Sequence, residues 1–200
     1  QTVEIGGGKL YLKTLRDHHE TGFFKTGFRF SLADFSLDST SLNHTDRFFY
    51  ATRFDLFFSD YQMRLADDLH QLYVKKMAIS SSRQQVRLDS LAVEPVAAAP
   101  GDSLLRSLGK SELYALQIPA VILWNTNLHE AYFNKKLEIK KIEVSNPVIH
   151  FENFTALKKN GDTTRISDIY ELVLNYMEEI RVGELEVADG NITWTNHSRK

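Results

Sequence analysis

The chain of 200 residues contains no cysteine, which excludes disulfide bonds, cysteine zinc sites and thiol nucleophiles. Its 24 basic residues are balanced by 26 acidic ones, whereas proteins that wrap nucleic acid usually carry a basic excess. We therefore expect no nucleic-acid partner. The longest clean apolar run, residues 118–124, contains Pro119 and is far shorter than the roughly 20 apolar residues that span a bilayer.

Sequence motifs for catalysis and cofactor binding are also scarce. The run Gly6-Gly7-Gly8 lacks the features of a phosphate-binding or dinucleotide-binding loop, and we interpret it as a flexible terminus or a turn. The run at 18–20, His-His-Glu, suggests a metal site, but adjacent strand residues point to opposite faces and metals need converging ligands. We predict no enzyme activity, no cofactor and no metal. A hydrolase whose site converges only in three dimensions is one alternative.

The positive signal is a repeated pattern of apolar residues. Its unit is an apolar residue, two other residues, an apolar residue, one other residue and a third apolar residue. In several copies one more alternating apolar residue precedes the unit. The extended copies lie at residues 30–37, 72–79, 116–123, 137–144 and 180–187. Their regular spacing, near 43 residues for several pairs of copies, is typical of a repeat architecture.

The clearest pair of copies predicts β structure. Residues 137–151 align on residues 180–194 without gaps at an offset of 43. Alternating apolar and polar residues are typical of a strand with one face in water, and a bulge or bend must absorb the two-residue gap, curling the sheet. The dipeptides Asn-Pro at 146–147 and Asp-Gly at 189–190 predict that both segments are equivalent β-hairpins. An ordinary antiparallel sandwich would show similar strands.

One segment has the periodicity of a helix. Residues 166–180 place Ile169, Val173, Tyr176 and Met177 on one face, and we predict the longest helix of the chain there, covering one end or edge of the sheet. A loop at 96–103 separates N-terminal β repeat units (1–95) from C-terminal ones (101–200), which we expect to form one continuous array. The predicted fold is all-β and mainly antiparallel, with one or two amphipathic helices. Its extended, curled repeat sheet would form a groove or half-barrel.

The segments KLEIKKIEVSNPVIHFEN and IRVGELEVADGNITWTN resemble the AsmA/TamB-like cell-envelope proteins, particularly those of Bacteroidetes. The likeness covers roughly residues 28–197. It implies a non-catalytic periplasmic module whose apolar β-groove handles phospholipids or supports outer-membrane assembly, with phospholipid acyl chains and envelope proteins as partners. The chain does not begin with a signal peptide. We expect a fragment of a longer, inner-membrane-anchored protein, touching the membrane only through other segments.

A groove of this kind would be lined by the apolar positions of the last two repeats. The candidate residues are Leu137, Ile139, Ile142, Val144, Ile149, Phe151, Val182, Leu185, Val187, Ile192 and Trp194. We expect them to share one concave surface, with the intervening Glu138, Lys140, Glu143 and Glu186 facing water. The alternative is a structural or interaction β-sandwich with a filled core and no lipid cargo.

Overall fold

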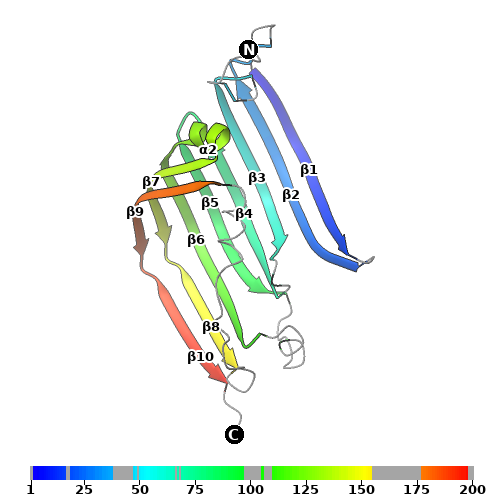
Figure 1. Cartoon of the computed structure of the whole chain (residues 1–200), viewed down its shortest axis with the longest axis vertical. Coiled ribbons are helices and arrows are strands. Elements are labelled where there is room, and N and C mark those ends of the chain that lie inside the picture. The colour runs from blue at the N-terminus through cyan, green and yellow to red at the C-terminus, as the bar shows by residue number, and fades with distance from the viewer. Residues whose placement is uncertain are drawn as a thin grey trace.

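The computed structural model describes residues 2–16, 19–37, 47, 48, 50–65, 67, 69–96, 105, 110–154 and 177–197. Within these ranges ten strands form a single sheet that does not close on itself, and a short helix, α2 Leu128–Asn134, lies against one face of it (Figure 1). The predicted all-β fold, an open, curled and mainly antiparallel sheet, is therefore confirmed. The described strands contain no second sheet that would make a sandwich.

The first six strands form an antiparallel meander in which each strand pairs with the next one along the chain. They are β1 Thr2–Arg16, β2 His19–Ala33, β3 Arg53–Arg64, β4 His70–Ser80, β5 Gln85–Pro95 and β6 Glu112–Thr126. Strand β5 precedes the predicted loop at 96–103 and β6 follows it, yet the two strands pair directly. The sheet thus runs without interruption between the two predicted halves of the chain.

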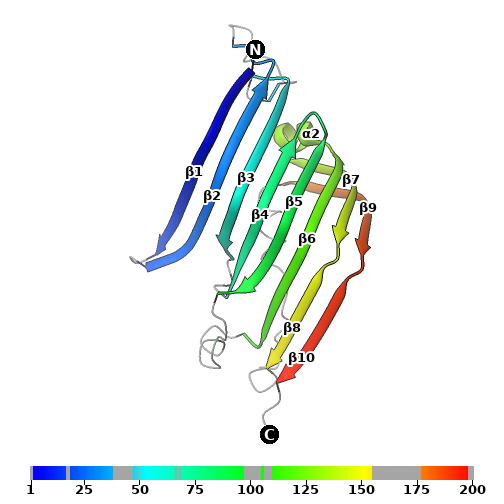
Figure 2. The ribbon, with the colours of Figure 1, turned by 180° about the vertical axis from the view of Figure 1, so that it is seen from behind.

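The last four strands do not form the predicted hairpins. They are β7 Lys136–Ser145, β8 Val148–Phe154, β9 Glu179–Ala188 and β10 Asn191–His197. Strands β7 and β8 are two pieces of one bent strand, because both pair antiparallel with β6; β9 and β10 likewise pair parallel with β7 and β8 (Figure 2). Asn146 and Asp189 have positive φ angles of 45° and 50°, and these residues bend the strand without reversing it.

The offset of 43 residues between the last two repeats is the register of this parallel pairing. Leu137 lies opposite Ile180, and Ile149 lies opposite Ile192 beyond the bend. Equivalent residues of the two repeats are therefore lateral neighbours on the same face of the sheet. The two segments are structurally equivalent, as predicted, although the equivalence is that of neighbouring strands.

A line of irregular backbone crosses the sheet. The pairing skips Asp60 and Lys75 between β3 and β4, and Ser90 and Pro119 between β5 and β6. Asp60 and Ser90 have φ angles of 51° and 53°, a left-handed conformation that costs non-glycine residues roughly 1–2 kcal/mol. In β4, β5 and β6 the skipped residues fall in the two-residue gap of the apolar pattern. The predicted bulge is present, and it keeps the apolar residues on one face across the bend.

The glycine run of β1 forms a separate irregularity within a strand, so its interpretation as a flexible terminus or turn is wrong. The register between β1 and β2 shifts between Ile5 and Gly8, and Gly7 has a φ angle of 77°. A Cβ atom on Gly8 would lie 2.2 Å from the ring of Phe28. Glycine therefore lets the neighbouring aromatic ring cover the strand at this point.

Helix α2 Leu128–Asn134 was not predicted. It begins after Asn127, whose side chain accepts a hydrogen bond from the Glu130 N–H at 3.1 Å, and Lys135, with a φ angle of 52°, caps its C-terminal end. For the predicted helix 166–180, residues 166–176, which include Ile169, Val173 and Tyr176, lie outside the described residues. Met177 and Glu178 are not helical and β9 begins at Glu179, so the predicted end of that helix is wrong.

Candidate functional site

We call the face of the sheet that carries α2 the inner face, because the pairing gathers apolar side chains there in rows that cross the strands. Directly opposed residues on neighbouring strands share a face. The first row contains Ile5, Phe30, Leu56, Ile79, Val86, Leu123, Ile142 and Leu185. The second contains Phe28, Phe58, Met77, Leu88, Val121, Val144 and Val187. The third, beyond the bend, contains Leu12, Phe24, Met63, Leu72, Val93, Leu116, Ile149 and Ile192.

The predicted groove residues occupy two neighbouring columns of this face. Each candidate on β9 or β10 lies beside its repeat equivalent on β7 or β8, and Phe151 and Trp194 have ring centroids 5.3 Å apart. On β7 the candidates are buried or half-buried, with Ile139 at 5% exposure. The equivalent positions of the outermost strand are exposed, up to 67% for Ile192. The structure thus brings the predicted residues together, and it leaves the outer column in solvent.

Charged residues of the same strands lie on the opposite, outer face. Lys141 Nζ lies 2.8 Å from a Glu143 oxygen, 2.6 Å from Glu186 and 3.8 Å from Glu184. The hydrogen bonds that Lys141 donates to Glu143 and to Glu186 raise the pKa of its amine above the ordinary value. Of the intervening positions predicted to face water, Glu143 and Glu186 belong to this network. The alternation in sequence therefore separates an apolar face from a charged face, as a half-solvated sheet requires.

Aromatic side chains fill the end of the inner face at which α2 lies. The ring centroid of Phe48 is 4.7 Å from that of Phe54, 5.7 Å from Tyr132 and 6.0 Å from Phe133. Leu32, Phe48, Ala51 and Phe54 form a buried cluster against which Leu128 and Phe133 of α2 pack. Sequence reasoning missed this cluster, although the aromatic-rich stretch around residues 48–58 was a signal for it.

A buried histidine lies at the start of β4. His70 is 1% exposed; its Nδ1 is paired with the Asp67 carboxylate, and its Nε2 accepts the Tyr114 N–H at 3.3 Å. Burial by itself would raise the pKa of Asp67, but hydrogen bonds from the ring and backbone N–H of His70 outweigh it, so the pKa lies below the usual value. Both ring nitrogens are engaged within the chain, so this pair serves structure rather than substrate chemistry.

The described residues contain neither a candidate metal site nor a helix that could span a membrane. No group of three or more acidic and histidine side chains in the described ranges could hold a metal ion, and His18 of the His-His-Glu run lies outside those ranges. His150 and His197 both contact Glu152, at 3.5 and 2.9 Å. In the part of the chain that the structure describes, no helix has the length and apolar character needed to cross a bilayer.

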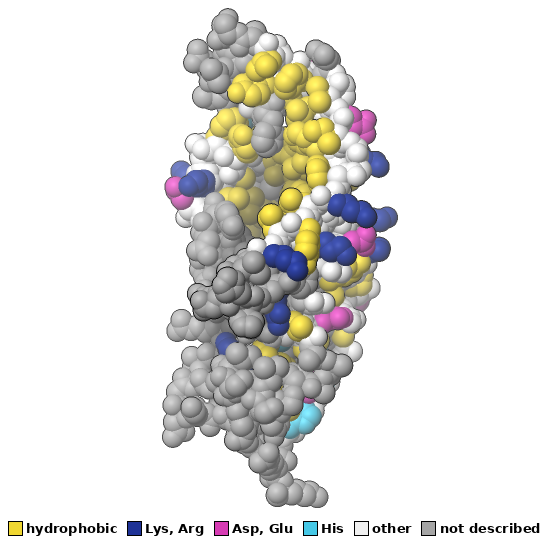
Figure 3. Space-filling model, turned by 90° about the vertical axis from the view of Figure 1, so that its right-hand side faces the viewer, with side chains coloured by type: hydrophobic (Ala, Val, Ile, Leu, Met, Phe, Trp, Pro, Cys, Tyr) yellow, Lys and Arg dark blue, Asp and Glu magenta, His cyan; other side chains and the backbone are white. Residues whose placement is uncertain are grey.

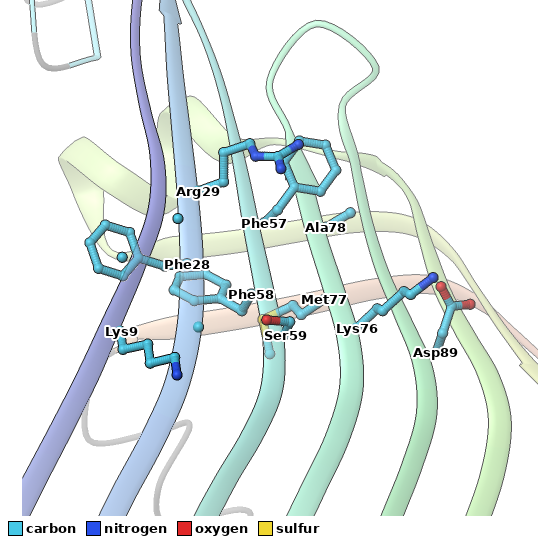
Figure 4. Close-up of a pocket in the computed structure, with 13 residues that line it drawn as sticks. Lys9, Phe28, Arg29, Phe57, Phe58, Ser59, Lys76, Met77, Ala78 and Asp89 are labelled. Carbon is cyan, nitrogen blue, oxygen red and sulfur yellow. The ribbon is translucent and has the colours of Figure 1, made fainter.

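The molecule has a hollow lined by hydrophobic side chains and, at the bend of the sheet, a cavity with charged residues in its lining. Figure 3, which looks past the β1 edge, shows hydrophobic side chains gathered in a hollow in the upper part of the view. On the outer face, a cavity of about 450 Å³ lies at the bend and is lined by residues from β1 to β5, among them Lys9, Arg29, Phe57 and Lys76 (Figure 4). In that view the Arg29 guanidinium lies beside the Phe57 ring. Asp89 also lines this cavity, and so do three residues of the second apolar row, Phe28, Phe58 and Met77, so the cavity combines charged and apolar groups.

Comparisons with known proteins identify no relative of this chain. No protein-family model matches the sequence, and neither a curated protein nor a solved structure matches it. The arrangement of the inner face and the resemblance in sequence pattern are therefore the grounds on which a function can be proposed.

Proposed function

We propose that this chain is a non-catalytic module of the bacterial cell envelope whose inner face binds phospholipid acyl chains. The observation that carries the proposal is the set of apolar rows that cross the open sheet from β1 to β9 and β10. Hydrocarbon binding needs apolar area and no directional contacts. Half-burial of a dozen methylenes would contribute about 5 kcal/mol, at about 0.8 kcal/mol for each methylene fully buried.

The exposure of the rows at their two ends supports a surface that receives a ligand. Ile5 and Leu12 on β1 are 50% and 56% exposed, and Leu185 and Ile192 on the opposite edge are 63% and 67% exposed. Soluble proteins rarely leave contiguous apolar patches of large area in water, and such patches mark binding sites for proteins, membranes or ligands. Concave, mostly apolar sites are typical of small-molecule and lipid-sized ligands.

The cellular setting comes from the sequence resemblance alone. The resemblance to AsmA/TamB-like proteins is the support for a proposed location in the periplasm, with anchoring to the inner membrane through other segments. Phospholipid handling or outer-membrane assembly would be its role. A surface without polar specificity would accept many lipids, which suits a conduit better than a receptor. Fractionation of cells into periplasmic, membrane and cytosolic material is the direct test of this location.

The second candidate is a structural or interaction domain without lipid cargo. The aromatic cluster of Leu32, Phe48, Ala51, Phe54 and α2 favours it, because that end of the inner face is a filled core. The two functions differ in what the purified protein carries. Mass spectrometry of gently extracted protein should find bound phospholipid if the acyl-chain proposal holds, and only protein if the face serves packing alone.

Photo-crosslinking in cells tests the face directly. Ile142 and Glu143 are adjacent in β7 and both half-buried, but they point to opposite faces. We expect a photoreactive residue at position 142 or 185 to form adducts with labelled phospholipid, while position 143 forms few. Equal adducts at 142 and 143, or adducts at 143 alone, would contradict the proposal.

A further inference from the structure

The outer edge of β9 and β10 has backbone groups available for another strand. Among the described residues, no strand pairs with this edge. The Asn146 N–H donates to the Ala188 carbonyl and the Asn191 N–H donates to the Pro147 carbonyl, each at 2.8 Å. Because successive residues of a strand direct their backbone groups to alternate sides, the neighbouring Val187 and Ile192 direct theirs away from β7 and β8.

This edge has the same geometry as the surface on which β9 and β10 themselves lie. It carries the same apolar pattern at an offset of 43 residues, and Asp189 repeats the left-handed bend of Asn146. On β7, Val144 is half-buried beside its neighbour, whereas its equivalent Val187 is 53% exposed. The apolar side chains of the outermost strand are thus exposed at positions that a further strand in the same register would cover.

Charge indicates which kind of strand fits. Between β7 and β9 the joining cation is Lys141, which lies within 4 Å of Glu143, Glu184 and Glu186. The position of β9 equivalent to Lys141 is Glu184, and the side chains of Glu184 and Glu186 are 63% and 55% exposed. The edge therefore presents carboxylates where the preceding strand presented an amine, and a basic residue on an incoming strand would complement them.

We propose that the β9–β10 edge is a docking site for a further parallel β-strand with the same apolar pattern and a basic residue at the position of Lys141. Main-chain hydrogen bonds would supply most of the affinity, and the apolar positions and the basic residue would set the register. This interaction uses the edge of the sheet, and it does not depend on lipid binding to the inner face.

The test uses the whole chain and a labelled peptide with the sequence of residues 136–154, which has the pattern and Lys141. We expect saturable binding, measured by fluorescence anisotropy, and at least tenfold weaker binding of a matched peptide with Lys141→Glu. Hydrogen exchange should slow at the outward amides of Val187, Ile192 and Trp194. The amide of Asn191, already bonded to Pro147, should change little.

A charge swap tests the site itself. The chain variant Glu184→Lys should bind the Lys141→Glu peptide at least fivefold more tightly than the unchanged chain does. Its exposed side chain makes the variant a mild change for the fold. Equal binding of both peptides to the unchanged chain would overturn the proposal, as would protection of β1 in place of β10. Concentration-dependent self-association that protects this edge without peptide would show that a second copy is the occupant, and would also overturn it.

Discussion

Gly183 is the position at which a single methyl group should disturb the parallel pairing most. It lies opposite Lys140, where the pairing of β7 and β9 is interrupted between Ile139 and Lys141. A Cβ atom on Gly183 would lie 2.8 Å from the carbonyl oxygen of Lys140. That oxygen belongs to the backbone, so no side-chain rotation can relieve the contact. We expect Gly183→Ala to destabilise the edge strand by about 1–2 kcal/mol, since overpacking costs about 1–3 kcal/mol and the alanine recovers about 0.4–1 kcal/mol by restricting the unfolded chain.

Gly190→Ala is the matched control, because it makes the same change on the same outermost strand. Its Cβ atom would lie 3.3 Å from Cγ of the Pro147 ring, a contact that a small movement relieves. We expect this variant to lie within about 0.5 kcal/mol of the unchanged chain. Urea unfolding followed by tryptophan fluorescence measures both, and Trp194 reports on this edge. Hydrogen exchange across β9 should accelerate in the Gly183 variant alone. Equal stability of the two variants would refute the reasoning from the Lys140 carbonyl.

The other predictions concern burial and acid stability. Val74 is 1% exposed and Val148 is 46% exposed. Val74→Ala should therefore lower the free energy of unfolding by about 2 kcal/mol, and Val148→Ala by less than about 0.5 kcal/mol. Similar urea midpoints for the two variants would contradict the assigned burial. The Asp67 carboxyl has a folded pKa below its usual value of 3.8, so it contributes stability that is fully present above pH 3.8 and is lost as the pH falls through the folded pKa. Asp67→Asn should therefore destabilise the chain at pH 7 and flatten the acid limb of a pH series of urea midpoints. Asp60→Asn, which removes an exposed pair with Lys75, should change the neutral-pH midpoint little. If the two aspartate variants behave alike, the buried contact to His70 is not what stabilises this region.

Alternation is a local property, so the apolar pattern located the strands from β4 onward, whereas it did not locate β1 or β3 and its copy at 30–37 extends past the end of β2 at Ala33. The copies at 72–79 and 116–123 lie in β4 and β6, and their two-residue gaps contain the irregular positions Lys75 and Pro119. A break in alternation has a direct physical meaning, since side chains on both sides of it can face one core only if the backbone slips there. The bend of the sheet could therefore be predicted from the sequence alone.

Strand direction could not be predicted from the same residues. An asparagine or aspartate with positive φ is suited to a hairpin turn, but Asn146 and Asp189 use the same conformation to bend a continuing strand. The local sequence of a turn and of such a bend is alike. The informative feature was the ungapped offset of 43 across both halves of the repeat, because strands that lie side by side in parallel must bend at equivalent residues.

The composition of the candidate face was predictable, and its exposure was not. Ile142 and Leu185 occupy the same position of the apolar pattern, yet Leu185 is exposed because of its place at the edge of the sheet. Exposure depends on which strands lie alongside, and that depends on topology. Helix α2 was missed although Asn127 and Glu130 were a readable capping signal; its segment is short and follows directly on a strand.

The parallel register determines how duplication of a repeat would widen the sheet. In the meander from β1 to β6 each strand reverses direction, so a duplicated segment would have to contain two strands to leave its neighbours undisturbed. In the part formed by β7 to β10, one 43-residue unit corresponds to one lateral step of about 4.8 Å. Tandem duplication of that unit would widen the sheet by one strand at a time while every row of side chains continued in line. The width of such a sheet could therefore change in evolution by whole repeats, one strand for each repeat gained or lost.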